Sequence, residues 1–156
     1  MSNRWVLLLL LVMAACESGS SGSATVSIKN GFGDKPPWTI CKATYRDVEF
    51  GKIPIGEQSG PQKVEPGLDY VLMVAAWNDP DCKPEHCLPI ASKNEEEVVD
   101  GQTRTIEINM ANHQGPCPPE GIQPIPQAQY DRILKLYPEY GFKPYDQRTE
   151  NPQCKK

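Results

Sequence analysis

Short apolar runs separated by turn-forming residues constrain the fold of this chain more than any other feature. Between residues 24 and 110, Pro, Gly, Asn and Asp interrupt the sequence about every 8–12 residues, and the whole chain has 16 prolines and 12 glycines. Such closely spaced breaks leave little room for helices of ordinary length, whereas strands of about 5–6 residues fit between them. The pattern therefore predicts an all-β domain.

Alternation of apolar and polar residues identifies the clearest strands. Residues 24–29 and 103–110 alternate with a period of two, which indicates one buried face and one solvated face. Residues 70–77 are apolar on both faces, as in a central strand that is covered on two sides. A buried helix is the competing interpretation, but Asn78-Asp79-Pro80 directly after the run favours a strand.

Further runs at residues 38–45 and 48–53, and weaker ones at 62–64, 88–92 and 96–99, complete the expected domain. Glu65-Pro66-Gly67 and Asp100-Gly101 are predicted turns. Seven or eight short strands predict an antiparallel β-sandwich or small barrel over residues 24–115. Residues 64–70 and 99–106 resemble the turn-and-strand patterns of exported immunoglobulin-like or prealbumin-like modules. The resemblance implies a β-sandwich and supplies no catalytic residues.

The strand pattern also predicts a core. We expect seven inward-facing side chains to be buried together: Val26, Ile28, Ile40, Leu72, Val74, Ile106 and Ile108.

Residues 116–156 form a distinct extension. Residues 116–126 are Pro-rich and are expected to be extended. A short amphipathic helix is predicted near residues 127–137, because Tyr130, Ile133, Leu134 and Tyr137 share one helical face. An irregular tail follows. We expect the aromatic face of the helix to dock on the sandwich; a platform for a ligand is the alternative.

The first sixteen residues have the composition of an export signal. Arg4 precedes an unbroken apolar run, Trp5 to Met13, which is shorter than the roughly 20 residues of a membrane-spanning helix. The sequence Met13-Ala14-Ala15-Cys16 resembles the bacterial lipobox, although Met13 stands where the family usually has Leu. The resemblance implies cleavage before Cys16 and a diacylglyceryl thioether on that cysteine, with residues 1–15 as the signal peptide.

The lipobox resemblance also implies a location. Residues 16–23 would be a lipid-anchored tether, flexible because of its Gly/Ser composition, and the membrane would be a partner through the lipid on Cys16. Glu17 replaces the Asp that retains enterobacterial lipoproteins in the inner membrane, which favours the outer membrane if the cell has one. The alternatives are an ordinary secretory signal, with Cys16 in a disulfide, and an uncleaved anchor.

Charge argues against one class of partner. Without residues 1–15 the chain carries 15 basic and 20 acidic side chains, and no basic cluster offsets this excess. Nucleic acid is therefore not expected as a partner, because its phosphates repel an acidic surface. An envelope protein is a candidate partner.

The loop at residues 78–89 has the greatest density of reactive side chains. Cys82, His86 and Cys87 could supply three zinc ligands, with His113 or Cys117 as a fourth, but their spacing matches no usual zinc motif. Calcium ligation by Asp79, Asp81 and Glu85 lacks the EF-hand pattern. We predict no bound metal or cofactor, because cysteines of exported chains usually form disulfides.

Five cysteines remain if Cys16 carries lipid, so an odd one is left over. The sequence does not fix their pairing. Cys82 and Cys87 are expected to form a disulfide across a four-residue turn, Cys41 and Cys117 could close a longer loop, and Cys154 is the candidate free thiol.

No catalytic motif accompanies these features. The chain has neither a nucleophile elbow nor a phosphate-binding glycine loop, and Glu95-Glu96-Glu97 is more typical of an exposed turn than of a paired-carboxylate site. We expect a lipoprotein with a binding, assembly or structural role rather than an enzyme. A metal-dependent envelope enzyme built on the 78–89 loop and a small-ligand carrier with an aromatic lid are the alternatives.

Overall fold

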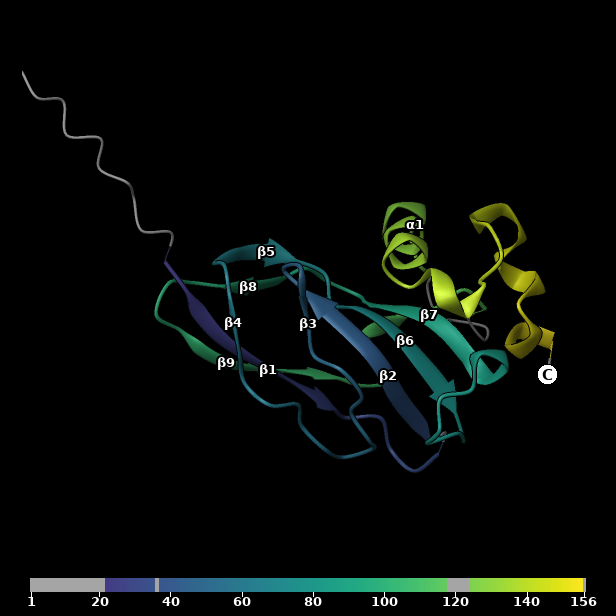
Figure 1. The fold of residues 1–156 in the computed structure, drawn as a ribbon, viewed down its shortest axis with the longest axis horizontal. Coiled ribbons are helices and arrows are strands. Elements are labelled where there is room, and N and C mark those ends of the chain that lie inside the picture. The colour runs from purple at the N-terminus through teal and green to yellow at the C-terminus, as the bar shows by residue number, and fades with distance from the viewer. Residues whose placement is uncertain (1–21, 36, 118–123, 156) are drawn as a thin grey trace, which may run out of the picture.

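The computed structural model describes residues 22–35, 37–117 and 124–155, and this part of the chain folds mostly as β-sheet (Figure 1). The strands are β1 (Ala24–Asn30), β2 (Trp38–Tyr45), β3 (Val48–Glu49), β4 (Gln62–Val64), β5 (Gly67–Asp69), β6 (Leu72–Trp77), β7 (Cys87–Ser92), β8 (Glu96–Val98), β9 (Thr103–Ile108) and β10 (His113–Gln114). The helices are α1 (Gln127–Leu136) and the 3-10 helices η1 (Pro84–His86), η2 (Pro138–Tyr140), η3 (Tyr145–Glu150) and η4 (Pro152–Lys155).

Two sheets face each other across one core. The smaller has the strand order β4-β1-β9 and the larger has the order β10-β7-β6-β2-β3, while β5 and β8 form a separate two-stranded sheet. Side chains from the smaller and the larger sheet, such as Ile28 of β1 and Met73 of β6, fill the space between these two sheets and are fully buried. The described part of the chain is thus mostly β with a short C-terminal helix, which confirms the coarse part of the predicted fold.

One strand pair differs from the expected antiparallel arrangement. β1 and β9 pair in parallel, with Thr25 opposite Thr103 and Asn30 opposite Ile108, whereas the other strand pairs are antiparallel. A parallel pair needs a long connection rather than a tight hairpin, and residues 31–102 supply that connection here. Local periodicity identifies strands but does not contain their relative direction.

β6 is the central strand of the larger sheet, as its composition predicts. Its residues from Leu72 to Ala76 are fully buried. Val71, Met73 and Ala75 face the core between the sheets, whereas Leu72, Val74 and Ala76 belong to a second apolar cluster beneath α1. The strand is therefore covered by a sheet on one face and by a helix on the other.

The predicted core is buried but divided. All seven residues are at most 2% exposed. Val26, Ile28, Ile40, Ile106 and Ile108 lie between the sheets, and Leu72 and Val74 lie on the opposite face of the larger sheet. The expectation that the seven pack together is wrong for these last two. Alternate side chains of a strand point to opposite faces of its sheet, and those of Leu72 and Val74 point to the face that α1 covers.

Other boundaries shift for local reasons. The predicted strand at 48–53 shortens to Val48–Glu49, because Gly51 has a φ of +68° and turns the chain. Ile53 then rejoins the sheet through an isolated bridge to Ile40. The turn at Asp100-Gly101 is present, with Gly101 at a φ of +73° that favours glycine.

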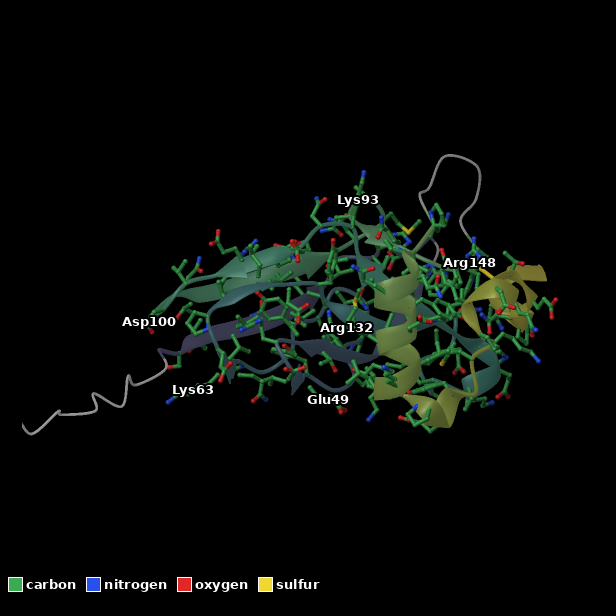
Figure 2. All side chains as sticks on the ribbon, turned by 90° about the horizontal axis from the view of Figure 1, so that it is seen from above. Glu49, Lys63, Lys93, Asp100, Arg132 and Arg148 are labelled. Atoms are coloured by element: carbon green, nitrogen blue, oxygen red, sulfur yellow. A yellow bond between two sulfur atoms is a disulfide. The ribbon has the colours of Figure 1, made fainter. Side chains whose placement is uncertain are left out.

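α1 confirms the predicted helix at 127–137 and its docking. Tyr130, Ile133 and Tyr137 are buried against the outer face of the larger sheet. Arg132 of α1 donates two hydrogen bonds to the carboxylate of Asp69, at 2.7 and 3.0 Å. Figure 2 shows Arg132 near the middle of the helix where it crosses the domain. Among the described helices, none is long and apolar enough to span a membrane.

Candidate functional site

The connection between β6 and β7 is the loop that the sequence marks as chemically dense, and Asp79 organises it. The Asp79 carboxylate accepts hydrogen bonds from the backbone N–H groups of Asp81 (2.9 Å) and Lys83 (2.8 Å). Nδ1 of His86 lies 2.8 Å from Oδ2 of the same carboxylate. The hydrogen bond with His86, aided by those from the backbone, lowers the pKa of Asp79 to about 2. Asp79 therefore remains ionised at neutral pH and holds the loop in shape.

Backbone geometry supports the same conclusion. Asn78 and Cys82 have φ values of +48° and +60°, a conformation that L residues adopt rarely. Asp79 contacts both residues. It follows Asn78 directly in the chain, and its backbone oxygen accepts a hydrogen bond from the N–H of Cys82 at 3.2 Å. Asp81 and Glu85 are exposed, and these two described carboxylates do not form with Asp79 a cluster that could hold a calcium ion.

A disulfide joins this loop to the larger sheet, but its partner is not the predicted one. Cys82 is bonded to Cys41 of β2, with a Cα–Cα separation of 5.7 Å, and Cys87 is a free, buried thiol. The pairing of β2 with β6 shifts register between Ile40 and Lys42, so Cys41 lies at a β-bulge. The expected Cys82–Cys87 bond is therefore wrong: the turn is short enough, but the loop folds back over the sheet and places Cys82 against β2.

The second disulfide also corrects the predicted pairing. Cys117 is bonded to Cys154, with a Cα–Cα separation of 5.2 Å, so neither Cys41–Cys117 pairing nor a free Cys154 is correct. Cys41 lies on β2, whereas Cys117 follows β10, which is three strands away in the sheet. Neighbouring strands are about 4.8 Å apart, so a Cys41–Cys117 bond would have to span far more than the roughly 5.5 Å that a disulfide allows.

Cys87 has the environment of an inert thiol. It follows His86 and lies near Asp79, which places the residue types of a Cys-His-Asp catalytic triad in one loop. However, the Cys87 thiol donates to the backbone oxygen of Lys83 at 3.2 Å, and burial raises its pKa to about 12. A catalytic thiol needs a lowered pKa and a base within hydrogen-bond reach. The arrangement does not activate Cys87 as a nucleophile.

This environment predicts that Cys87 is unreactive in the folded protein. An ordinary cysteine has a pKa near 8.5, so a pKa of about 12 lowers the thiolate fraction at pH 8 on the order of 10³-fold. Iodoacetamide should therefore label Cys87 on the order of 10³-fold more slowly in native protein than in protein unfolded in guanidinium without reductant. Cys87→Ala should take up no label in guanidinium. Labelling of native protein at the unfolded rate would contradict the account.

Zinc binding by the candidate ligands, which the sequence did not favour, does not fit the structure. The sulfur of Cys82 is oxidised in a disulfide and cannot serve as a thiolate ligand. His113 lies on β10, where its Nδ1 contacts the backbone oxygen of Asn109 at 3.0 Å and its ring packs on Phe32. Within residues 22–35, 37–117 and 124–155, no three His, Cys, Asp or Glu side chains cluster as a metal site would require.

The C-terminal extension completes the surroundings of the loop. Nε2 of Gln153, in η4, donates to the backbone oxygen of Glu85 at 2.5 Å. Asn151 is buried and donates to the hydroxyl of Tyr130 at 3.2 Å, and its Oδ1 accepts the N–H of Lys143 at 3.2 Å. Hydrogen bonds thus connect the tail to the loop and to α1, and one disulfide each ties the loop and the tail to the rest of the domain.

The aromatic residues of the extension are structural in this arrangement. Tyr137 is 3% exposed, its hydroxyl hydrogen-bonds to Thr44 of β2, and burial raises its pKa to about 12. Tyr140 and Phe142 stack with their ring centroids 5.6 Å apart. Tyr130 and Tyr137 pack in the same apolar cluster as these rings.

The structure therefore separates the predicted site residues. Cys41 and Cys82 meet in a disulfide, Cys117 joins the tail, and Cys87 remains a buried thiol. Cys16 lies outside the described residues. Sequence reasoning missed the ion pair of Asp69 with Arg132 and the contact of Asp79 with His86, since both depend on how loops fold back on the sheet.

Comparisons with known proteins assign the chain to no family. No protein-family model matches the chain, no curated protein matches it, and no solved structure matches its fold. The two disulfides remain the strongest indication of context, since such bonds persist in oxidising, extracytoplasmic compartments.

Proposed function

We propose that this chain is an envelope lipoprotein, anchored through lipid on Cys16, whose folded domain has a non-catalytic binding, assembly or structural role. The domain would be a β-sandwich of the immunoglobulin-like or prealbumin-like type, and two sheets around a shared core support this. Glu17 after the cysteine favours the outer membrane, if the cell has one.

The use of the cysteines carries the proposal. Four of the six are consumed in the Cys41–Cys82 and Cys117–Cys154 bonds, and Cys87 is a buried thiol. An ordinary secretory signal would leave Cys16 in the exported chain, where it would need a disulfide partner. The folded domain offers Cys16 no exposed thiol as that partner, whereas lipidation at the lipobox accounts for Cys16 directly.

The chemistry of the loop supports a non-catalytic role. Its carboxylate Asp79 is engaged by its own loop, its thiol Cys87 is buried, and its other sulfur is oxidised. Two disulfides brace the loop and the tail, as suits a rigid module that is exposed outside the cytoplasm.

Substitution of Cys16 tests the anchor. Cys16→Ala should abolish incorporation of labelled palmitate in cells, because no thiol remains to form the thioether, and the chain should leave the membrane fraction once its signal is removed. Cys87→Ala is the matched control and should retain both label and membrane association. A Cys16→Ala chain that still takes up label, or that stays membrane-bound with its signal removed, would show that the anchor is elsewhere.

A further inference from the structure

The end of the domain at which β1 begins has an unusual surface. Ser23 accepts a hydrogen bond from the N–H of Gly101 at 2.9 Å, and Thr25 donates to the oxygen of Gln102 at 2.7 Å. The turn between β8 and β9 therefore lies against the first described residues. Figure 2 shows Lys63 and Asp100 at this end of the molecule and Arg148 at the other. We call this surface, with its residues Ser23, Arg46, Lys63, Leu68 and Val99, the N-terminal face.

Two large apolar side chains are exposed together on the N-terminal face. Leu68 is 54% exposed and Val99 is 53% exposed. Leu68 of β5 lies opposite Glu97 of β8, and Val99 follows Glu97 by two residues, so both point to the same side of this two-stranded sheet. Val98 between them points inward and is 1% exposed. Glu97 lies on the same side and is exposed, so the N-terminal face combines two apolar side chains with a carboxylate.

A charged groove opens at the same end of the domain. It has a volume of about 410 Å³, and Ser23, Arg46, Lys63 and Glu65 contribute to its walls. Arg46 donates to the backbone oxygens of Glu65 (3.2 Å) and Pro66 (3.1 Å), so its guanidinium is fixed at the groove. Lys63 is exposed and has no carboxylate within ion-pair distance among the described residues. Asp47 also lines the groove, so it offers both charge signs, as a zwitterionic ligand requires.

If Cys16 is lipidated, as in the proposed function, the length of the segment from Cys16 to Ser23 limits which surface of the domain can lie near the bilayer. Ser23 follows Cys16 by seven positions. A Gly/Ser-rich chain of this length has a root-mean-square span of about 15 Å. β1 runs away from Ser23 for seven residues, a length of about 23 Å. The opposite end of the domain would reach the bilayer only if the tether were almost fully stretched, so the N-terminal face is the surface held near the membrane.

We propose that the N-terminal face rests on a bilayer of zwitterionic phospholipid. Leu68 and Val99 enter the interfacial region, the cations of Arg46 and Lys63 contact head-group phosphates, and the nearby carboxylates Asp47 and Glu65 contact head-group ammonium groups. The acidic net charge of the chain disfavours an anionic bilayer, which is why the proposal commits to a zwitterionic one.

The native tryptophans of the folded domain lie away from the N-terminal face, so the quenching of their fluorescence by lipid is the reference level for a test of this proposal. Trp38 and Trp77 pair across β2 and β6, and Asn30, at the far end of β1, hydrogen-bonds to the backbone of Trp38. Both therefore lie away from the N-terminal face. Met110, which is 40% exposed, follows the far end of β9 and is a matched surface position. Leu68→Trp and Met110→Trp thus place a reporter at either end of the domain.

The experiment uses the lipidated full chain in vesicles of phosphatidylethanolamine and phosphatidylcholine that contain a head-group nitroxide lipid, a short-range quencher of tryptophan. Quenching should rise for Leu68→Trp and remain at the parent level for Met110→Trp. Adding Lys63→Glu to Leu68→Trp should lower the quenching, because it removes a phosphate contact. Mass spectrometry of each preparation confirms lipid on Cys16, and absence of that lipid would refute the proposed anchor itself. Equal quenching at positions 68 and 110 in lipidated protein, or none at either, would overturn the orientation proposed here.

Discussion

Replacing Leu72 by alanine is expected to lower the free energy of unfolding by about 2–5 kcal/mol. Leu72 is fully buried on β6 and packs beneath α1 with Val74 and Tyr130. Removing its side chain leaves a cavity between the central strand and the helix, and the surrounding sheet and helix can close that cavity only in part. The cost is a large fraction of the stability of an ordinary domain, which is about 5–15 kcal/mol.

Leu68→Ala is the matched control for this measurement. The same two side chains are exchanged, but Leu68 is 54% exposed, so the expected change is within about 0.5 kcal/mol. Chemical denaturation of both variants under oxidising conditions gives the comparison. A cost for Leu72→Ala as small as that for Leu68→Ala would contradict the placement of β6 between the smaller sheet and α1.

Removing the Cys41–Cys82 disulfide is expected to have the second large effect. The bond joins residues 41 positions apart in the chain, and loop-closure entropy for such a span corresponds to about 4 kcal/mol of stabilisation. The double substitution Cys41→Ala/Cys82→Ala should therefore lower the free energy of unfolding by about 2–4 kcal/mol, the lower figure allowing for residual structure in the unfolded chain.

The double variant is preferred to a single one. Cys41 Sγ lies only 3.9 Å from Cys87 Sγ, so a Cys41 thiol left without Cys82 could form a non-native disulfide with Cys87. Cys87→Ala serves as the control, since it removes one sulfur but leaves both disulfides intact. Peptide mapping without reduction should show Cys41 linked to Cys82 and Cys117 linked to Cys154 in the parent chain. A Cys82–Cys87 peptide, together with an unaffected stability of the double variant, would contradict the structure.

Features that depend on a few neighbouring residues could be predicted from the sequence. The central strand followed from an apolar run on two faces, and α1 followed from residues spaced as on one helical face. β5 was missed because Gly67, its first residue, belongs to the predicted turn at Glu65-Pro66-Gly67, and β10 was missed because its two residues contain no measurable periodicity. The division of the core was also missed, since nothing in the β6 sequence indicates that the extension covers one of its faces.

Disulfide pairing illustrates the limit of local reasoning. Cys82 and Cys87 are close in sequence, but the bulge at Cys41 and the positive φ of Cys82 direct Cys82 to β2 instead. Cys117 pairs with Cys154 in a tail that folds back against the loop at residues 78–89, as the contact of Gln153 with Glu85 shows. Each pairing depends on strand order and loop direction, neither of which is contained in the spacing of cysteines.

The anchor at Cys16 is the central claim, and the mass of one peptide tests it most directly. Trypsin digestion of protein purified from membranes should release residues 16–29, which end at Lys29. The account predicts that this peptide begins at Cys16 and carries a diacylglyceryl thioether, with an acyl chain on its amino group where the cell adds one. A peptide in which Cys16 is an unmodified thiol or is linked by a disulfide to another cysteine, or in which residues 1–15 are still attached, would contradict it.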